Sequence, residues 1–436
     1  MKITFLGAGS SVFVRNVIGD SMHVPSLREA EVALYDIDPQ RLNESRRMLE
    51  NLQRNTPGAA MRFATYCGEE NLREALRDAD FAVCAIQVGG YEPSTVIDFE
   101  VPKRFGLRQT IGDTLGVGGI FRGLRTLPAM ELFLRTMAEV CPRVIFLNYT
   151  NPMAILTGYA RRYHDSVQMT GLCHSVQVCG PALVTGLGLE WDDTIQTKIA
   201  GINHMAWLLE ISRNGVDLYP ELKRLSLERG APDHDRVRHK IMHTFGYYIT
   251  ESSEHLSEYL PWFIRNDYPE LIEEYNIPLD EYPRRCVRQI EHWRHIAGDL
   301  VDNPELTHTR SNEYASYIMD AVATNRPFKF GGNVLNTGLI TNLPREACVE
   351  VPCLVDASGI APTYIGDLPE QLAALNRTNI NVQLLTIEAY VRRSREAVYQ
   401  AALLDPHTAA QLDIDTTVKL CDALIEAHGN MLPELR

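Results

Sequence analysis

A short apolar segment at the N-terminus leads directly into a glycine-rich turn, and this combination constrains the fold more than any other feature of the chain. Residues 2–6 (KITFL) predict a strand, and residues 7–12 read GAGSSV. In a strand–turn–helix unit, Gly7 permits the tight turn and Gly9 lets the backbone approach a pyrophosphate, which the free N–H groups of the helix N-terminus then bind. Val12 replaces the third glycine of the usual GxGxxG pattern. We therefore expect a Rossmann fold that binds a dinucleotide.

The second predicted strand, residues 31–35, ends at an acidic residue, Asp36. A carboxylate at this place accepts hydrogen bonds from the adenosine ribose and repels a 2′-phosphate, so we expect NAD to be bound in preference to NADP. The separation between Gly9 and Asp36 exceeds the usual spacing of about 20 residues, so the first helix or the loop after it must be long. The alternative interpretation is a glycine turn followed by a solvated aspartate.

Apolar runs alternate with helical patterns through the first half of the chain, which is typical of a parallel sheet. Further strands are expected at residues 81–86 and 144–147, and a helix rich in Leu, Met, Ala and Glu is expected at residues 124–140. Beyond this half, the polar stretches and the helical patterns become longer. We predict an α/β chain in which residues 1–190 form an NAD-binding Rossmann domain and residues 191–436 form an α+β domain for substrate binding and oligomerisation.

The charge and the cysteine pattern exclude several classes of function. Asp and Glu number 56 against 42 Lys and Arg, which gives a formal net charge of -14, and no basic run is present. Such a surface repels phosphate backbones and anionic lipid, so nucleic-acid and membrane partners are not expected. The chain shows no signal-peptide pattern and no apolar run of about 20 residues that could span a bilayer. Its nine cysteines are scattered and odd in number, which indicates thiols in a cytoplasmic protein.

Two short polar segments could carry chemistry, and each has a structural alternative. Asn151 follows the apolar strand 144–147, where it would either face the nicotinamide crevice of a Rossmann fold or cap a turn before Pro152. Cys173 and His204, about thirty residues apart, could share a transition metal that keeps positions open for a substrate. The alternative for these two residues is a buried thiol and a core imidazole.

A third segment, residues 251–259 (ESSEHLSEY), crowds titratable groups together. At helical spacing His255 and Tyr259 lie one turn apart on the same face. The alternative is an acidic, solvated helix face. The residues alone therefore predict a Rossmann enzyme with room for a metal site.

Together these motifs resemble a known family. The segments that carry the resemblance are 3–10 (ITFLGAGS), 36–38 (DID), 89–93 (GGYEP), 113–116 (DTLG), 151–153 (NPM), 173–177 (CHSVQ), 201–205 (GINHM), 251–255 (ESSEH), 342–344 (NLP) and 349–352 (VEVP). They run almost from end to end. With so many motifs in this order, the chain resembles the NAD- and manganese-dependent glycoside hydrolases of family 4, and among them the α-galactosidase branch.

The resemblance implies a fold like that of lactate and malate dehydrogenases, with a Rossmann domain followed by an α+β substrate domain. It also implies a glycosidase mechanism without the usual pair of carboxylates. A hydride passes from sugar C3 to NAD, a base removes the acidified C2 proton, and the C1–O bond breaks by elimination. Water then adds and the hydride returns, so NAD is a resident catalyst.

The resemblance also assigns roles to individual residues. Cys173 and His204 correspond to ligands of Mn²⁺, and His174 stands where relatives carry the acid that assists the leaving group. His255 is the first choice for the C2 base, and Tyr259 is the second. The residues expected to bind the dinucleotide are Gly7, Gly9, Ser10, Ser11, Asp36 and Asn151, and those expected to contact the substrate are Asp113 and Asn151.

An unphosphorylated α-galactoside is the expected substrate. The chain contains no basic cluster for a 6-phosphate, and Cys173 is followed by His174 in place of the Asp of the phospho-α-glycosidase branch. Val178 and Cys179 stand where α-galactosidases carry Gly-Thr, which leaves an α-galacturonide or α-glucuronide as the second choice of substrate. A 2-hydroxyacid dehydrogenase on the same fold and a catalytically silent NAD-binding regulator are the competing functions. We expect a homodimer or a homotetramer.

Overall fold

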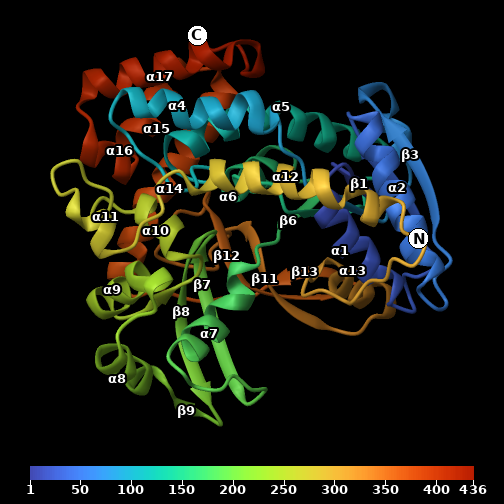
Figure 1. The fold of residues 1–436 in the computed structure, drawn as a ribbon, viewed down its shortest axis with the longest axis horizontal. Helices are drawn as coiled ribbons and strands as arrows, with labels where there is room; N and C mark the ends of the chain where they lie inside the picture. Colours follow the sequence, from blue (N-terminus) through green and yellow to red (C-terminus); the bar gives the residue numbers. More distant parts are fainter.

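The computed structural model describes residues 1–436, apart from the side chain of Ser11, and is built around one mixed sheet (Figure 1). Its first six strands are parallel and lie in the order β3-β2-β1-β4-β5-β6, which is the order of dinucleotide-binding Rossmann domains. These strands are β1 (Lys2–Leu6), β2 (Glu31–Asp36), β3 (Arg62–Cys67), β4 (Phe81–Cys84), β5 (Ile145–Asn148) and β6 (Gln168–Gly171). All four predicted strands are confirmed to within two residues at either end.

The remaining strands extend the same sheet beyond β6, in the order β6-β11-β12-β7-β8-β10, and all are antiparallel to their neighbours. They are β7 (Ile195–Ile202), β8 (Met205–Arg213), β9 (Val216–Asp217), β10 (Tyr248–Ile249), β11 (Phe328–Leu335), β12 (Cys348–Asp356) and β13 (Gly359–Pro362). Strand β9 pairs with β8, and β13 pairs with β12. The sheet therefore continues across the boundary that the sequence suggests near residue 190.

Helices cover both faces of the parallel strands, and each face buries its own set of alternating side chains. On one face, helices α1 and α2 pack with Phe5 and Val83 in an apolar core that continues into the antiparallel strands. On the other face, helices α3, α5, α6, α14, α15 and α17 pack with Leu6 and Phe146. A smaller core lies between helices α7–α9 and the β7–β8 hairpin.

The helices of the first part are α1 (Ser11–Met22), α2 (Pro39–Arg54), α3 (Leu72–Leu76), α4 (Val96–Arg104), α5 (Gly116–Val140), α6 (Met153–Tyr163) and α7 (Ser175–Gly186). Those of the second part are α8 (Tyr219–Arg229), α9 (Arg236–Phe245), α10 (Ser253–Tyr259), α11 (Glu270–Glu274), α12 (Glu281–Val301), α13 (Ala315–Thr324), α14 (Glu370–Arg392), α15 (Arg395–Leu404), α16 (Pro406–Gln411) and α17 (Ile414–His428). Short segments at residues 69–71, 90–95, 233–235 and 429–431 form single helical turns.

The helix expected at residues 124–140 begins earlier, at Gly116. Glycine has low helix propensity, so the glycine-rich first turn of α5 showed no helical pattern in the sequence. The structure shows why glycines stand there. An added Cβ would lie 2.2 Å from Gly112 O at Gly118 and 2.5 Å from Thr114 C at Gly119. The first turn of α5 therefore packs directly on the preceding loop.

C-terminal helices return to the N-terminal part of the molecule. Helix α14 contacts α5 and α6, α15 contacts α5, and α17 contacts α4. The red α17 and the cyan α4 lie together near the top of Figure 1. The division into residues 1–190 and 191–436 therefore stays a prediction. Among the described residues, no helix is long and apolar enough to cross a membrane.

The glycine-rich turn after β1 has the conformation that its sequence requires. Gly7 has φ +88°, and its N–H donates to Tyr35 O at 2.9 Å. A side chain at Gly7 would place its Cβ 2.6 Å from Ala85 O, and one at Gly9 would place its Cβ 2.9 Å from Asp36 Oδ2. The two glycines therefore let the chain turn sharply while it stays in contact with the ends of β2 and β4.

We predict that Gly7→Ala destabilises the fold more than the same change at Gly215. Gly215 is a matched control because its φ is +80° and an added Cβ would have open space around it. Each variant forces an L-residue into the left-handed region, at a cost of about 1–2 kcal/mol, but only Gly7→Ala also meets a backbone oxygen. Urea denaturation should show a clearly larger loss of unfolding free energy for Gly7→Ala. Equal losses in the two variants would contradict the prediction.

Candidate active site and metal centre

The end of β2 and the turn after β1 are held together by a carboxylate. Asp36 Oδ2 accepts a hydrogen bond from Gly9 N–H at 2.6 Å, and its Oδ1 accepts one from Asp38 N–H at 3.0 Å. A carboxylate has about four acceptor sites, so Asp36 can hold this turn and still accept the predicted bonds from a ribose. The long separation between Gly9 and Asp36 is taken up by the loop at residues 23–30, because α1 itself ends at Met22.

Helix α1 supplies the helix N-terminus that a pyrophosphate needs. Ser10 stands at the N-cap, its N–H donates to Gly7 O at 2.9 Å, and its hydroxyl makes no capping bond. Val12, which replaces the third glycine, is 66% exposed, so no close helix packing requires a glycine there. The side chain of Ser11 lies outside the described part of the chain, and its contact with a dinucleotide stays a prediction.

Asp113 and Asn151, both predicted at the substrate, lie in contact. Asn151 Nδ2 donates to Asp113 Oδ2 at 3.3 Å. Arg122 of α5 lies 4.0 Å from the same oxygen and donates to Asn151 O at 3.3 Å and to the Tyr282 hydroxyl at 3.1 Å. Burial would raise the pKa of Asp113, but the Arg122 charge, together with His255, His204 and the Thr114 hydroxyl, holds that pKa below its usual value. Asn151 Oδ1 is buried without a partner in the described chain, which leaves an acceptor for a ligand.

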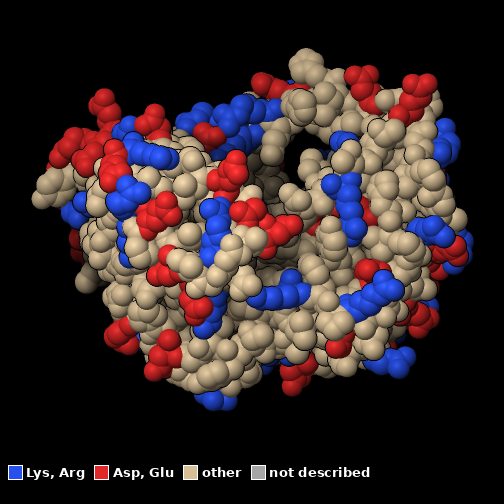
Figure 2. Space-filling view, turned by 90° about the horizontal axis from the view of Figure 1, so that it is seen from below, with Lys and Arg blue, Asp and Glu red and all other residues tan. Residues whose placement is uncertain are grey.

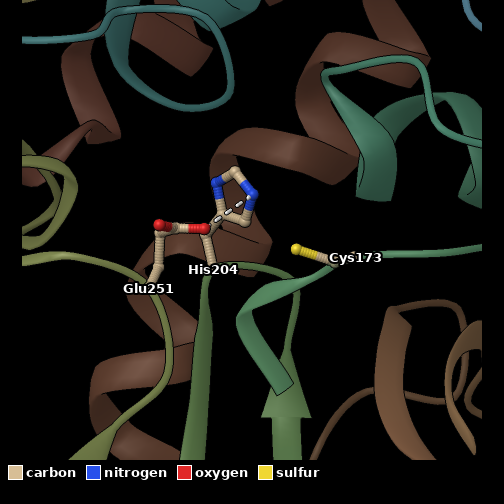
Figure 3. Close-up of side chains that lie close together, drawn as sticks. All are labelled: Cys173, His204 and Glu251. Carbon is tan, nitrogen blue, oxygen red and sulfur yellow. Dashed lines mark ion pairs between the residues drawn. The ribbon is translucent and has the colours of Figure 1, made fainter. Parts of the chain in front are cut away.

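Cys173, His204 and Glu251 form a cluster that could hold a metal ion. One ligand atom from each lies within 4.8 Å of the others, and His204 Nε2 is 3.4 Å from Glu251 Oε2. Figure 3 shows the Cys173 thiol pointing toward this pair from the opposite side. Bonds to a transition metal are about 2.0–2.3 Å long, so a small closure would let one ion contact all three. The structure thus brings the two predicted ligands together and adds Glu251.

Each ligand of this cluster follows the end of a strand. Cys173 comes two residues after β6, and Glu251 comes two residues after β10. His204 lies in the two-residue turn between β7 and β8, where it has φ +61°. Strand β10 pairs with β8 through Ile249 and Trp207, which places Glu251 beside the β7–β8 hairpin. Three separate strand ends therefore build the cluster.

Burial sets the protonation of the cluster. Burial raises the pKa of the Cys173 thiol well above its usual value, and the charges of Glu350 and Glu251 raise it further. Burial also lowers the pKa of His204. Burial would raise the pKa of Glu251, but His255 and His204, together with the Ser252 N–H and the Arg238 charge, bring that pKa to about 2. A cation that binds to this cluster would displace the proton of the Cys173 thiol.

The chemistry of these donors fits a first-row transition metal. A thiolate and an imidazole bind such ions in preference to Mg²⁺ or Ca²⁺, and a carboxylate is a ligand that suits Mn²⁺. Three protein ligands leave further positions open for water or substrate, as catalytic metal sites require. The residues present therefore fit the metal that the resemblance implies.

Helix α10 presents His255 and Tyr259 to the cluster, and both lie on one face as predicted. The fully buried Tyr259 hydroxyl is 3.1 Å from His204 Nδ1, so it orients the imidazole. His255 lies with its ring centroid 5.0 Å from that of His204, and its Nδ1 is 2.8 Å from Ser252 Oγ. Burial raises the pKa of Tyr259 well above its usual value.

His174 pairs with a buried carboxylate. Its Nε2 lies 2.7 Å from Glu313 Oε1, and 44% of its side chain remains exposed. The hydrogen bond to Glu313 raises the pKa of His174 and outweighs the effect of burial. The imidazole stacks on Tyr149, with ring centroids 5.9 Å apart. An accessible imidazole whose pKa is raised by a carboxylate partner is suited to donate a proton.

Sequence reasoning missed several of the buried partners. Glu258 on α10 accepts hydrogen bonds from Thr110 N–H and Gly112 N–H, both at 2.8 Å, and so ties this helix to the loop before α5. Its place next to a candidate base could have drawn attention to it. Glu313 lies far from His174 in the sequence, and no local pattern connects the two residues.

Comparison with known proteins gives two informative relatives. The chain is 58% identical over 437 residues to an α-galactosidase of Bacillus subtilis (strain 168), and the match covers 100% of both chains. It is 25% identical over 447 residues to an α-galacturonidase of the same organism, which covers 98% of this chain and 97% of that protein.

Solved structures share the fold. A 6-phospho-α-glucosidase from gut microorganisms, in complex with NAD and Mn²⁺, matches with a TM-score of 0.81 at 22% identity and covers 100% of this chain and 99% of its own. A malate dehydrogenase from Plasmodium falciparum matches with a TM-score of 0.53 at 14% identity, over 90% of this chain and 99% of its own. The predicted dehydrogenase-like α/β fold is confirmed.

The sequence was also compared with models of protein families. Residues 2–189 match the family 4 glycosyl hydrolases, and residues 199–408 match the C-terminal domain of the same family. These two matches follow one another along the chain. The protein therefore belongs to family 4 of the glycosyl hydrolases.

Proposed function

We propose that this chain hydrolyses unphosphorylated α-galactosides with NAD and Mn²⁺ as cofactors. The observation that carries the proposal is that a dinucleotide-binding turn and a transition-metal cluster meet at one site. Phe13, in the first turn of α1, lies with its ring centroid 6.3 Å from that of His174, and His174 adjoins the metal candidate Cys173. A redox cofactor site of this kind in a glycosyl hydrolase points to the redox-assisted mechanism. The α-galactosidase at 58% identity supports the substrate class.

The chain offers a separate set of residues to each cofactor. When bound, NAD supplies a hydride acceptor and donor, and Mn²⁺ supplies a Lewis acid. Cys173, His204 and Glu251 would hold the metal. The turn after β1, with Asp36, would hold the adenosine and pyrophosphate, and Asn151 would lie between the nicotinamide and the sugar.

Three side chains would act as the acid, the base and the substrate-binding carboxylate of the reaction. His174, whose pKa its glutamate partner raises, would donate a proton to the leaving oxygen. His255 would remove the C2 proton, since Tyr259 is fully buried and already hydrogen-bonded to His204. Asp113, fixed as a carboxylate, would accept hydrogen bonds from the sugar hydroxyls and hold the ring in place.

The competing substrates and functions are less well supported. An α-galacturonide or α-glucuronide is disfavoured by the lower identity, 25% against 58%, to the galacturonidase of the same organism. A uronide also brings a carboxylate, whereas the buried cation at the site, Arg122, is already used by Asp113 and Tyr282. A 2-hydroxyacid dehydrogenase uses a His–Asp pair without a metal, whereas His204 here lies in a three-donor cluster.

A small α-glycoside is the partner that this proposal implies. Figure 2 shows acidic and basic side chains interspersed around a hollow, with a group of basic side chains along its upper rim, and the formal net charge is -14. Such a surface gives no favourable field for a nucleic acid. A homodimeric or homotetrameric state and a cytoplasmic location stay predictions.

The first prediction of this proposal concerns the substrate. With NAD, Mn²⁺ and a thiol reductant, the protein should release nitrophenol from p-nitrophenyl α-galactoside without net formation of NADH, because the hydride returns to the sugar. The 6-phosphate and the α-galacturonide should react at least about 10-fold more slowly, since the buried Arg122 is already paired with Asp113 and Tyr282. Turnover of uronides alone would assign the neighbouring substrate class, and stoichiometric NADH would favour a dehydrogenase.

The second prediction concerns the metal. Cys173→Ser and His204→Ala should each weaken Mn²⁺ binding by about 100-fold or more, and Glu251→Gln by about 10-fold, while the fold is kept. Calorimetric titration of EDTA-treated protein measures this directly. The control is Glu254→Gln, whose carboxylate pairs with Arg285 outside the cluster.

Chelation should also abolish activity, and Mn²⁺ with a thiol should restore it. Full activity of the metal-free protein would contradict the metal site. Equal Mn²⁺ affinity of the Glu251→Gln variant and the wild type would remove Glu251 from the ligand set and leave the other two ligands in place.

The third prediction concerns the base. Hydrolysis in D₂O should place deuterium at C2 of the released sugar, because the base exchanges its proton with solvent. His255→Ala should slow this exchange by about 100-fold or more without loss of NAD or Mn²⁺ affinity. Tyr259→Phe should instead weaken Mn²⁺ binding, since Tyr259 orients His204. Exchange that survives His255→Ala and is lost in Tyr259→Phe would identify the tyrosine as the base, and product without C2 deuterium would contradict the elimination.

A further inference from the structure

The strands that carry the two predicted metal ligands are joined to the centre of the sheet at one residue pair each. In the described chain, β6 meets β11 at Gly171–Asn333, and β7 meets β12 at Gly201–Glu350. By contrast, β11 and β12 pair with each other continuously from Phe328 to Leu335, and in this pairing Asn333 faces Glu350. Gly171, Asn333, Glu350 and Gly201 therefore form one row across the sheet, which we call the joint.

A side-chain hydrogen bond crosses the middle of the joint. Asn333 Nδ2 donates to Glu350 Oε1 at 2.9 Å and lies 3.5 Å from Gly171 O. Both side chains are buried, with exposed fractions of 0% for Asn333 and 1% for Glu350. Two apolar side chains would fill this space without the cost of burying polar groups. The pair therefore indicates that the strands must be held in a defined position at the joint.

The joint lies directly next to the metal cluster. Cys173 comes two residues after Gly171, and His204 comes three residues after Gly201. The Cys173 carbonyl is also held by a hydrogen bond from the buried Tyr314 hydroxyl. Glycine at the β6 end lets β6 approach β11 closely, since an added Cβ at Gly171 would lie 3.0 Å from Asn333 Cβ. A shift at either end of the joint would therefore move a ligand.

The joint also contains unused polar atoms. Glu350 Oε2 and Asn333 Oδ1 are buried and have no hydrogen-bond partner in the described chain. Buried oxygens without a hydrogen-bond partner lower the stability of the fold. If the pair served stability alone, we would expect these oxygens to have hydrogen-bond partners, or apolar side chains in their place. The two oxygens without partners therefore favour a role in positioning the strands.

We propose that Asn333 and Glu350 are positioning residues that set the separation between Cys173 and His204. The inference rests on the metal site of the proposed function. Loss of the side-chain bond would let β6 and β7 move apart at their single pairs, and the two ligands would separate with them. The dinucleotide turn would not move, because it is anchored on β1 and β2 by Gly7, Gly9 and Asp36.

The test uses Co²⁺ as a probe in EDTA-treated full-length protein. Thiolate bound to Co²⁺ gives a charge-transfer absorption, so the spectrum reports Cys173 ligation independently of activity. Glu350→Leu and Asn333→Ser should each weaken Co²⁺ binding by about 10-fold or more and reduce this band, with NAD affinity unchanged. Glu350→Gln keeps an oxygen acceptor for Asn333 and should retain both the affinity and the band. If Glu350→Leu fails to fold, the result for Asn333→Ser alone decides the test.

The matched control is Asn336→Ala. Asn336 is also fully buried near the end of β11, and its Nδ2 donates to Ile340 O and Leu343 O, away from the joint. This variant should lower the melting temperature and keep the Co²⁺ affinity. Joint variants that lose only stability, with wild-type Co²⁺ affinity and spectrum, would overturn the inference. Wild-type protein that binds no Co²⁺ would instead overturn the metal site itself.

Discussion

Backbone hydrogen bonds between four parallel strands hold the starting points of the functional loops in one row. The row consists of Leu6 in β1, Cys84 in β4, Asn148 in β5 and Gly171 in β6. The carboxyl ends of parallel strands meet at one edge of a sheet, so the glycine-rich turn, the segment of Asn151 and the segment of Cys173 must leave from the same edge. The antiparallel strands then bring His204 and Glu251 to this edge from elsewhere in the chain. Every functional contact described above depends on this alignment.

Two buried carboxylates at the site are each matched by a basic side chain. Asp113 has Arg122, and Glu313 has His174. Isolated charges in such surroundings would cost several kcal/mol each, so these pairs are a condition for burying the site. Glu251 differs, because one of its neighbouring imidazoles, that of His204, belongs to the predicted metal site. A divalent cation would complete its neutralisation and would also stabilise the thiolate form of the buried cysteine, whose pKa is otherwise raised. The electrostatics of the cluster and the types of its ligands thus both favour a divalent transition-metal cation.

The sequence patterns predicted those features of the structure that depend on residues close together in the sequence. The turn from Gly7 to Gly9, the acidic end of β2 and the shared face of His255 and Tyr259 each depend on residues close in sequence, and the structure confirms their geometry. The long-range pairs gave no such signal. Glu313 reaches His174 through tertiary packing, and the joint between β6 and β7 depends on strands that are distant in sequence. The early start of α5 was missed for another reason, because its glycines oppose a helix locally and are required only by contact with the preceding loop.

Because the fold resembles that of a malate dehydrogenase, the histidines of the site can be compared with what a dehydrogenase needs. A dehydrogenase of that type needs one imidazole to move a proton, whereas here three imidazoles have three different partners. His204 has Nε2 toward Glu251 and Nδ1 toward the Tyr259 hydroxyl. An imidazole that binds a metal through Nε2 must keep its proton on Nδ1, and the tyrosine then accepts that proton in a hydrogen bond. Such a residue cannot also exchange protons with a substrate. In the proposed mechanism, proton transfer would therefore be the role of two histidines outside the ligand set, which pair with Glu313 and Ser252. This division of roles separates the metal-dependent chemistry of the site from that of a simple dehydrogenase on the same sheet.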